Sequence, residues 1–187
     1  MSRDITRADF LRGGFLRPNR KARRTQGPRP PWALDGDAFA ARCTRCKVCV
    51  TACPEGILVM AEGQKDPDVA RRDAPSVDFP PSVDFLRGAC TFCARCVGVC
   101  EPRALSRFSA ETPPRIREPW RIKAQISNRC LAMRGTTCRV CADPCPTRAI
   151  TFKSHTAGHV FPEIDTCQCT GCGACYAPCP VNAISIS

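Results

Sequence analysis

Residues 43–54 read CTRCKVCVTACP, a run in which four cysteines are separated by two, two and three residues before a proline. The chain repeats this motif three more times, and sixteen of its 17 cysteines belong to the four copies. The first motif contains Cys43, Cys46, Cys49 and Cys53; the second Cys90, Cys93, Cys96 and Cys100; the third Cys130, Cys138, Cys141 and Cys145; and the fourth Cys169, Cys172, Cys175 and Cys179. Such repetition indicates duplicated structural units rather than scattered thiols.

Each motif is followed by a similar tail, which predicts a short strand. The tails read PEGILV, EPRALS, PTRAIT and PVNAIS, and the proline near the start of each redirects the chain. We expect strands at residues 57–59, 104–105, 149–152 and 183–186, and a hairpin between 151–152 and 160–161. Apolar alternation predicts another strand within residues 120–126. The sequence PSVDF occurs at 75–79 and at 81–85, and we favour the copy nearer Cys90 as a strand.

These elements predict an α+β, loop-rich fold of tandem ferredoxin-like domains of the bacterial two-[4Fe–4S] type, with short strands and short helices around the clusters. Residues 1–38 form a basic, flexible N-terminal arm, and residues 39–108 form a domain with motifs one and two. Residues 109–119, with three prolines, form a linker, and residues 120–187 form a domain with motifs three and four. A chain with 17 Cys, 18 Pro and 12 Gly cannot build a large apolar core, so it depends on what its cysteines hold.

The spacing of the cysteines favours cubane [4Fe–4S] clusters. Three cysteines at two-residue gaps let one loop wrap three corners of a cube, and in two-cluster ferredoxins the fourth cysteine ligates the neighbouring cluster. Applied to this chain, that rule gives four ligand sets: Cys43, Cys46 and Cys49 with Cys100; Cys90, Cys93 and Cys96 with Cys53; Cys130, Cys138 and Cys141 with Cys179; and Cys169, Cys172 and Cys175 with Cys145. Structural zinc is the alternative, although zinc sites usually place two Cys-x2-Cys pairs far apart.

A few residues depart from this pattern. The first gap of the third motif is seven residues long, a loop that could shield its cluster, change its potential or make it labile. Glu101 moves the proline of the second tail by one position. Cys167 is left over, and we expect a partly buried free thiol, with a spare ligand or a repair thiol as alternatives. His155 and His159 flank a predicted turn and are expected to be surface residues, because thiolates already occupy the cluster corners.

Cluster binding changes the charge balance of the chain. The formal charge is +11, but four thiolates around an oxidised cubane core leave about −2 per cluster, so four clusters lower the total to about +3. Residues 1–34 contain nine Lys and Arg and two Asp, so the arm is strongly basic. The arm is a solvated tail, a protein-docking segment tipped by Trp32, or a contact for nucleic acid or membrane. Because the arginine-rich stretch 17–29 lacks aromatics for base stacking, we expect no nucleic-acid partner.

The sequence offers no signal for export or membrane insertion. No segment has the roughly 18 apolar residues of a membrane span, and the residues around Arg7 that resemble a twin-arginine motif lack the apolar stretch that should follow. We therefore expect a cytoplasmic location, where thiols remain reduced. Neither an acid–base pair nor an activated nucleophile stands out, so we expect no enzyme and assign the chemistry to the cofactors.

The basic arm, the segment RPPW at 29–32, the four motifs and the widened third motif together resemble the NapF ferredoxin-type family of periplasmic nitrate reductase systems. The resemblance implies a cytoplasmic [4Fe–4S] protein that assists maturation of the nitrate reductase catalytic subunit NapA before export. It implies the precursor of NapA as partner and the sixteen motif cysteines as ligands. The alternative function is that of a polyferredoxin subunit that relays electrons between a dehydrogenase and a reductase.

Overall fold

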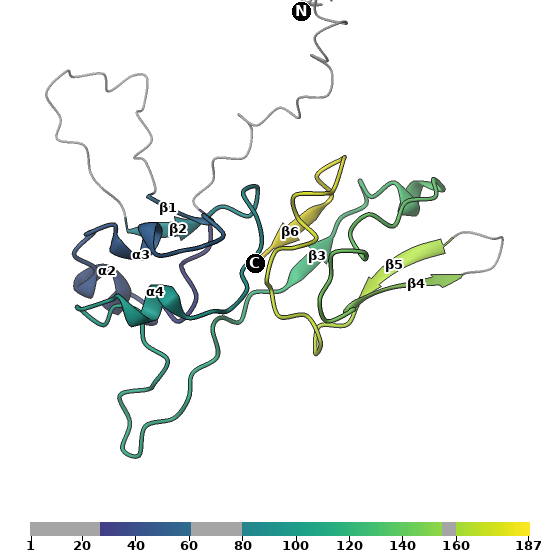
Figure 1. Ribbon diagram of the computed structural model, residues 1–187. Helices are drawn as coiled ribbons and strands as arrows, with labels where there is room; N and C mark the ends of the chain where they lie inside the picture. Colours follow the sequence, from purple (N-terminus) through teal and green to yellow (C-terminus); the bar gives the residue numbers. More distant parts are fainter. Residues whose placement is uncertain (1–26, 61–79, 155–159) are drawn as a thin grey trace, which may run out of the picture.

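The computed structural model of the chain describes residues 27–60, 80–154 and 160–187 (Figure 1). The first half contains the helices α2 (Ala38–Arg42), α3 (Val48–Thr51) and α4 (Arg95–Gly98) and the strands β1 (Leu58–Met60) and β2 (Pro81–Val83). The second half contains β3 (Ala124–Ile126), the 3-10 helix η4 (Ala132–Arg134), β4 (Ile150–Ser154), β5 (Val160–Ile164) and β6 (Ile184–Ile186). Within the described ranges, no helix has the length and hydropathy that crossing a membrane requires.

No element in the described ranges is longer than five residues, which confirms a small, loop-rich fold with few short helices and strands. The tandem arrangement of two ferredoxin-like domains stays a prediction, as do the boundaries between residues 39–108, 109–119 and 120–187. Two groups of buried side chains are present, one in each half of the chain.

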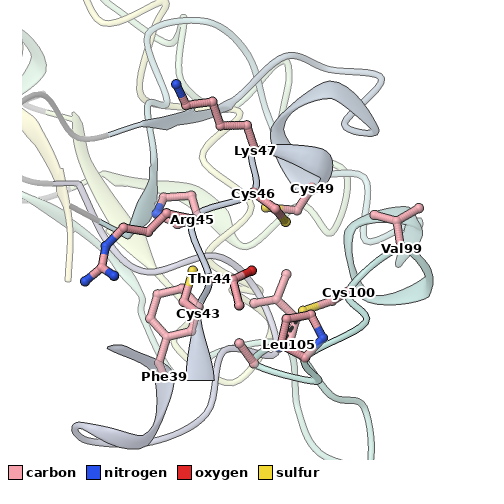
Figure 2. A pocket seen from close by; sticks show the side chains of 13 residues that line it. Phe39, Cys43, Thr44, Arg45, Cys46, Lys47, Cys49, Val99, Cys100 and Leu105 are labelled. Atoms are coloured by element: carbon pink, nitrogen blue, oxygen red, sulfur yellow. Dashed lines mark hydrogen bonds between the residues drawn. The ribbon is translucent and has the colours of Figure 1, made fainter. Parts of the chain in front are cut away.

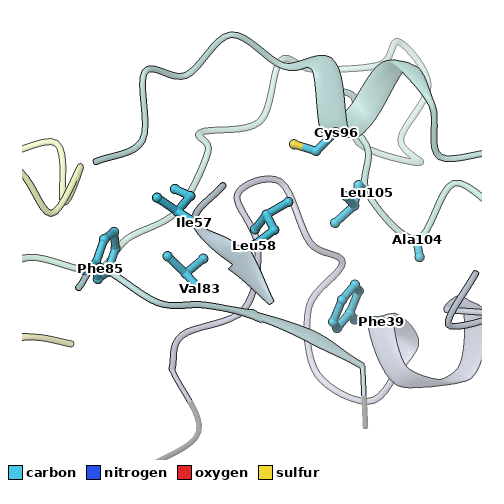
Figure 3. Close-up of a cluster of buried hydrophobic side chains, with 8 residues drawn as sticks. All are labelled: Phe39, Ile57, Leu58, Val83, Phe85, Cys96, Ala104 and Leu105. Atoms are coloured by element: carbon cyan, nitrogen blue, oxygen red, sulfur yellow. The ribbon is translucent and has the colours of Figure 1, made fainter. Parts of the chain in front are cut away.

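Strands β1 and β2 form an antiparallel pair beside the core of the first half. Leu58 lies opposite Val83, and Met60 lies opposite Pro81. Figure 3 shows the core side chains between this pair and the helices: Phe39, Ile57, Leu58, Val83, Phe85, Cys96, Ala104 and Leu105. Because β2 begins at residue 81, the strand predicted at the second PSVDF copy is confirmed, whereas the first copy at 75–79 lies outside the described residues.

The strand predicted at residues 104–105 is reduced to a single β-bridge, in which Leu105 pairs with Ala33. Pro30 and Pro31 lie shortly before the bridge on the partner segment, and a proline has no N–H with which to extend a ladder. Ala104 and Leu105 nevertheless have only 1% and 2% exposure. The second tail therefore supplies core side chains without forming a strand.

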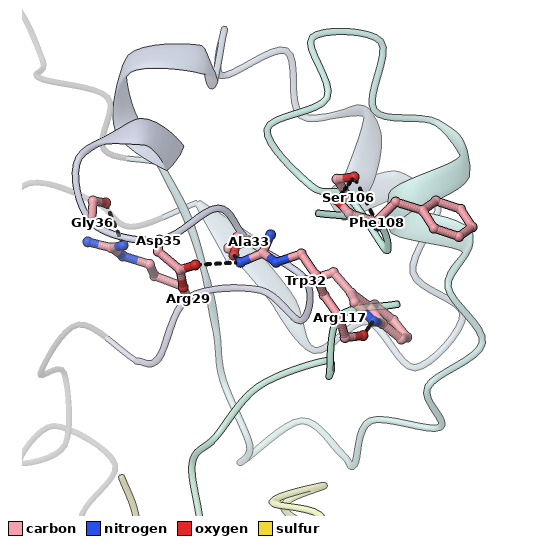
Figure 4. Close-up of polar contacts among 8 residues, drawn as sticks. All are labelled: Arg29, Trp32, Ala33, Asp35, Gly36, Ser106, Phe108 and Arg117. Carbon is pink, nitrogen blue, oxygen red and sulfur yellow. Dashed lines mark hydrogen bonds and ion pairs between the residues drawn. The ribbon is translucent and has the colours of Figure 1, made fainter. Parts of the chain in front are cut away.

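The end of the predicted arm packs against the first half. The N–H of Val83 donates a hydrogen bond to the Pro28 carbonyl at 2.8 Å, and the indole N–H of Trp32 donates to the Arg117 carbonyl at 3.1 Å (Figure 4). Trp32 keeps only 6% exposure. The prediction that Trp32 forms an aromatic tip for a partner is therefore wrong, because the chain itself buries this side chain. Residues 1–26 lie outside the described residues.

The predicted linker folds back on itself and is tied to the first half. Phe108 and Ile116 form an isolated antiparallel bridge, and the N–H of Arg117 donates to the Arg107 carbonyl at 2.7 Å. The Arg117 guanidinium also meets the Asp35 carboxylate at 2.9 Å (Figure 4). In Figure 1 this segment is the long loop between α4 and β3.

The second half contains two separate antiparallel pairs. Strand β3 pairs with β6, where Ala124 lies opposite Ile186. Strand β4 pairs with β5, where Ile150 lies opposite Ile164. The second pair confirms the predicted hairpin. Both pairs carry buried apolar side chains into the second core, because Ala124 and Ile150 have only 4% and 7% exposure.

The strand predicted within residues 120–126 is shorter than expected and begins only at Ala124. Trp120 leaves the line of the strand and donates its indole N–H to the Thr170 carbonyl at 2.8 Å. The start of this segment therefore contacts the fourth cysteine motif instead of extending the sheet.

Each motif ends in the same turn, although the four tails differ in sequence. The carbonyl of the last cysteine accepts a hydrogen bond of 3.0 to 3.3 Å from the N–H three residues later. The third residue always has a φ between 51° and 61°: Gly56, Arg103, Arg148 and Asn182. The next two residues are buried, with at most 7% exposure: Ile57 and Leu58, Ala104 and Leu105, Ala149 and Ile150, and Ala183 and Ile184. Glu101 therefore shifts the proline but leaves the turn intact.

Candidate metal centres

The cysteines of the first motif converge with one cysteine of the second. All 17 cysteines lie in the described residues, and every one is a free thiol. Figure 2 shows an open cavity whose walls include Cys43, Cys46, Cys49 and Cys100. Because Cys100 is the last cysteine of the second motif, two motifs meet at this cavity in the crossed arrangement that the sequence predicts. Ligation by these residues stays a prediction.

The third motif gathers its thiols despite its long first gap. A second open cavity is lined by Cys130, Cys138, Cys141 and Cys179, again a set drawn from two motifs. Within the seven-residue gap, η4 is followed by a turn in which the N–H of Thr136 donates to the Leu131 carbonyl at 2.9 Å. The additional residues therefore close on themselves, and the ends of the gap remain near one another.

The second set is centred on buried and partly buried thiols. Burial is the main cause of the raised pKa of Cys90, and Cys53 and Cys93 lie close enough for their charges to raise it further. Cys90 and Cys93 in turn lie close to Cys96, which has 7% exposure. Cys53 belongs to the first motif, so its position agrees with crossed ligation.

The fourth motif is the most deeply buried of the four. Cys169, Cys172 and Cys175 have 9%, 9% and 7% exposure, whereas Cys46 and Cys93 are exposed. Cys145, the predicted fourth ligand, packs against the buried cluster that contains Cys169 and Cys175. The remaining thiol, Cys167, lies outside these sets.

The backbone of three motif loops has a conformation typical of anion-binding loops. The second and fourth residues after the first cysteine have φ between 54° and 85°: Arg45 and Lys47, Phe92 and Ala94, and Gly171 and Gly173. Successive residues of opposite handedness direct backbone N–H groups into a concavity, an arrangement found at many Fe–S sites. The third motif, which is described throughout, has a positive φ only at Gly135.

Main-chain N–H groups donate hydrogen bonds to motif sulfurs. The donor and acceptor pairs are Phe92 with Cys90 (3.4 Å), Leu105 with Cys100 (3.4 Å), Ala124 with Cys169 (3.5 Å) and Ala183 with Cys179 (3.2 Å). Such bonds favour the thiolate over the thiol, and around an Fe–S cluster they adjust the reduction potential. The donor set therefore fits thiolate-ligated clusters.

Burial works in the opposite direction and keeps the thiols protonated when no metal is bound. It raises the pKa of Cys49, Cys90 and Cys141 to about 11 and that of Cys96 and Cys175 to about 12, and neighbouring thiolates add to this effect. Metal binding must therefore displace protons, with the metal supplying the compensating charge. In the described ranges, no group of three or more His, Cys, Asp or Glu side chains has the arrangement needed to hold a single metal ion.

The fourth motif packs directly against the first half of the chain. The N–H of Cys90 donates to the Cys172 carbonyl at 2.8 Å, which joins motif two to motif four. A Cβ at Gly173 would lie 2.0 Å from a carbon of the Phe85 ring, and a Cβ at Gly171 would lie 2.3 Å from the Ile122 carbonyl oxygen. The two glycines therefore allow a close approach as well as a positive φ.

Aromatic rings surround this junction. The Trp120 ring lies 5.9 Å from Phe85 and 5.7 Å from Phe92, centroid to centroid, and Tyr176 lies 6.1 Å from Phe85. Sequence reasoning did not assign these rings to the site, because Trp120 fits a strand pattern, Phe85 precedes the second motif, and Phe92 and Tyr176 are single aromatic residues within motifs. The glycines beside Cys172 were the available signal, since small residues there leave room for a neighbour.

Three residues that the sequence singled out lie outside the cavities or outside the described ranges. Cys167 is exposed, so the expected partial burial is wrong, and its N–H donates to the Asp165 carboxylate at 2.8 Å. The Asp165 turn holds Cys167 at the surface. His155 and His159 lie outside the described residues.

Comparison with known proteins agrees with this geometry. A family model described as a 4Fe–4S dicluster domain matches residues 41–105, which span the first two motifs and their tails. Together with the converging thiols, this match defines a ferredoxin-type iron–sulfur protein. The number of clusters stays a prediction.

Proteins of similar sequence identify the family to which the chain belongs. The ferredoxin-type protein NapF of Escherichia coli (strain K12) is 36% identical over 171 residues, which cover 91% of this chain and 87% of the relative. NapF of Haemophilus influenzae is 36% identical over 172 residues, with 90% and 85% coverage. The methylamine utilization ferredoxin-type protein MauM of Methylorubrum extorquens is 31% identical over 154 residues, with 76% and 63% coverage. The chain belongs to the NapF ferredoxin-type family.

Proposed function

We propose that this protein is a cytoplasmic [4Fe–4S] ferredoxin-type protein that assists maturation of the nitrate reductase catalytic subunit NapA before its export. The observation that carries the proposal is the convergence of Cys43, Cys46, Cys49 and Cys100 on one cavity, in a chain similar to NapF over 91% of its length. The choice of NapA as partner rests on the family. The protein acts by loading electrons or an Fe–S cluster into the unexported precursor.

The residues of the chain prepare the sites for this task. A [4Fe–4S] cluster, when bound, supplies one-electron redox chemistry. The crossed thiols hold each site from two motifs, so that binding and folding are coupled. Cys96 and Cys175 are buried and exclude water, whereas Cys46 and Cys93 are exposed and leave an edge accessible to a partner.

The cofactor part is tested by anaerobic purification followed by iron, sulfide and zinc analysis beside an EPR spectrum of the reduced protein. We expect about four iron and four sulfide per cluster and the signal of a reduced cubane. Zinc in place of iron and sulfide would overturn the proposal. The Cys167→Ser variant is the control, since that thiol lies outside the four sets, and it should keep the full metal content.

The maturation part is tested with the precursor of the catalytic subunit. We expect the two proteins to co-purify before export, and we expect a strain that lacks this protein to accumulate precursor with a reduced cluster content. Complementation with the Cys167→Ser variant should restore that content, and complementation with Cys46→Ser should not. Full cluster content in the deletion strain, with no binding, contradicts the proposed role.

A polyferredoxin that relays electrons between a dehydrogenase and a reductase is the second candidate function. The hydrogen bond between Cys90 and Cys172 favours it, because it links motif two to motif four across the halves. A relay requires rapid, reversible reduction by a physiological donor and stoichiometric transfer to an acceptor. A maturation factor does not require turnover of this kind, so the two functions are separable by experiment.

A further inference from the structure

The first motif presents cations to solvent on both sides of an exposed cysteine. Arg45 and Lys47 flank Cys46, and all three residues are exposed. Neither cation forms an ion pair with a described residue. Figure 2 shows both side chains extending away from the cavity, and residues 38–54 contain no acidic residue at all. No acidic side chain within this segment therefore compensates the two cations.

One exposed apolar side chain is next to Lys47 in the sequence, and another lines the same cavity as the two cations. Val48 follows Lys47 and is 44% exposed, and Val99, which lines the same cavity, is 36% exposed. We call Arg45, Cys46, Lys47, Val48 and Val99 together the motif-one face. It combines two exposed apolar side chains and two cations with a predicted cluster ligand, and apolar and charged side chains together are typical of protein-docking surfaces.

The third motif also exposes apolar side chains, but its cations are engaged within the chain. Met133 and Val140 are each 42% exposed. Near them, the Arg139 guanidinium lies over the Phe152 ring at 5.0 Å, and Arg129 donates to the Asn182 carbonyl at 2.8 Å. Cations with internal partners are less available to a second protein. The motif-one face is therefore the better candidate for electrostatic docking.

A comparison of loop positions strengthens this choice. At the two positive-φ positions the fourth motif has Gly171 and Gly173, whereas the first has Arg45 and Lys47. Long side chains are disfavoured in that conformation relative to glycine, and unfavourable backbone conformations are concentrated at functional sites. The two cations occupy these positions although glycine satisfies the backbone better.

We propose that the motif-one face is the docking surface for a protein partner with a carboxylate-rich rim around an apolar centre. The proposal deepens the proposed function, on which it rests, by naming the surface and the chemistry of the partner. A protein fits better than RNA, because Val48 and Val99 offer apolar contact whereas no exposed aromatic ring on this face offers base stacking. Docking there brings the partner to the exposed edge at Cys46.

The first arm of the test measures binding to the purified, unexported NapA precursor. The double variant Arg45→Glu/Lys47→Glu should bind about tenfold more weakly than the native protein at low ionic strength, and the difference should shrink as salt screens the charges. The matched control is Arg121→Glu/Arg148→Glu, which makes the same change of charge at exposed positions in the second half. The control should change binding by less than about threefold. All proteins must have equal iron and sulfide contents.

The second arm does not depend on the identity of the partner. One electron passes from the sulfur dioxide radical anion, supplied by dithionite, to an oxidised cluster, which yields sulfur dioxide and the reduced cluster. Stopped-flow reduction of the native protein should slow as salt rises, because the anion is attracted to the motif-one face. The double variant should lose or reverse this dependence, and the control should keep it. Reduction by the methyl viologen radical cation should show the opposite trend.

The two arms separate the possible failures. Loss of the salt dependence in the double variant, without precursor binding by the native protein, supports the face and contradicts the proposed partner. Equal behaviour of the double variant and the control in both arms overturns the docking face, whatever the native protein binds. RNA binding that is sensitive to the double variant, with no effect on the precursor, also overturns it.

Discussion

The first and fourth cysteine motifs have identical spacing, yet the structure places them in opposite environments. Cys46, in the middle of the first motif, is exposed, whereas its counterpart Cys172 has 9% exposure. The residues at the two positive-φ positions differ accordingly: Arg45 and Lys47 in the first motif, and Gly171 and Gly173 in the fourth. The loop of the first motif faces solvent and carries charged side chains, whereas the loop of the fourth motif packs against the first half of the chain.

This contrast separates two reasons for glycine in such loops. A positive φ alone does not require it, because arginine, lysine, phenylalanine and alanine occupy these positions in motifs one and two. Close approach does require it, because a Cβ at Gly173 would meet the Phe85 ring at 2.0 Å. The spacing of the cysteines therefore predicts where a cluster binds, and the residues between the cysteines depend on what packs against the loop.

The largest effect is expected from Gly173→Ala. The methyl group meets the Phe85 ring and the backbone must hold alanine at a φ of 85°, so we expect a loss of about 2 to 5 kcal/mol of stability. The measurement is anaerobic denaturant unfolding, together with iron content. Gly98→Ala is the control, because a Cβ added at Gly98 would meet nothing within 4 Å, and it should change stability by less than about 1 kcal/mol. Equal effects of the two substitutions would refute the packing argument.

The two motifs should also differ in the pH dependence of the metal-free protein. The pKa of Cys175 is raised to about 12 and that of Cys49 to about 11, from an ordinary value of 9.0, chiefly by burial. Above pH 9 the folded state holds these protons more tightly than the unfolded state, so stability falls as pH rises, and it falls over a wider range for the fourth motif. The cluster-bound protein should show no such fall, because both residues are then thiolates in the folded state and only the unfolded chain takes up protons as the pH is lowered.

Urea unfolding at about pH 8 and about pH 10, on metal-free and cluster-bound protein, measures this difference. The Cys175→Ser variant should reduce the pH dependence of the metal-free form more than Cys49→Ser does. A cluster-bound protein that loses as much stability as the metal-free form between these pH values contradicts the expectation.

A chelator should remove iron from the first and fourth motifs at different rates. Because the cysteines of the first motif are more exposed, an iron chelator added to the oxidised protein should remove iron from that predicted site on the order of tenfold faster than from the fourth. The release should have a fast and a slow phase. Cys46→Ser should reduce the amplitude of the fast phase, and Cys172→Ser should reduce that of the slow phase. A single phase in the native protein would show that burial of the thiols does not protect the iron.

The structural features that the sequence predicted correctly are those that depend on residues close together in the chain. The motifs, the tails and the β4–β5 hairpin follow from short-range spacing, and the common turn persists even where Glu101 displaces the proline. The sequence also predicted the two cavity sets, because the rule of crossed ligation relates each motif to its neighbour.

The sequence could not predict contacts between segments that are far apart. Trp32 lies 85 residues from Arg117, to which its indole N–H donates, so burial of this aromatic residue is not visible in the local pattern of the arm. The contact of Cys90 with Cys172 joins two motifs that the crossed-ligation rule keeps separate. Cys167 is exposed because the Asp165 turn displaces it from the motif that it precedes.

The smallest effect is expected from placing glycine in the first motif, at the position that Gly173 occupies in the fourth. Lys47 has a φ of 65°, so Lys47→Gly should relieve the backbone and raise stability by about 0.5 to 1 kcal/mol. Ala94→Gly, at a φ of 58° in the second motif, is the matched control and should stabilise to a similar extent.

Denaturant unfolding of both variants measures the effect of the backbone conformation on stability. Binding to the NapA precursor measures the effect of the lost charge. Only Lys47→Gly should weaken binding, because only that change removes a cation from the motif-one face. If Ala94→Gly stabilises the protein and Lys47→Gly does not, the lysine contributes a favourable interaction within the chain, and the difference between motifs one and four then arises from packing rather than from docking.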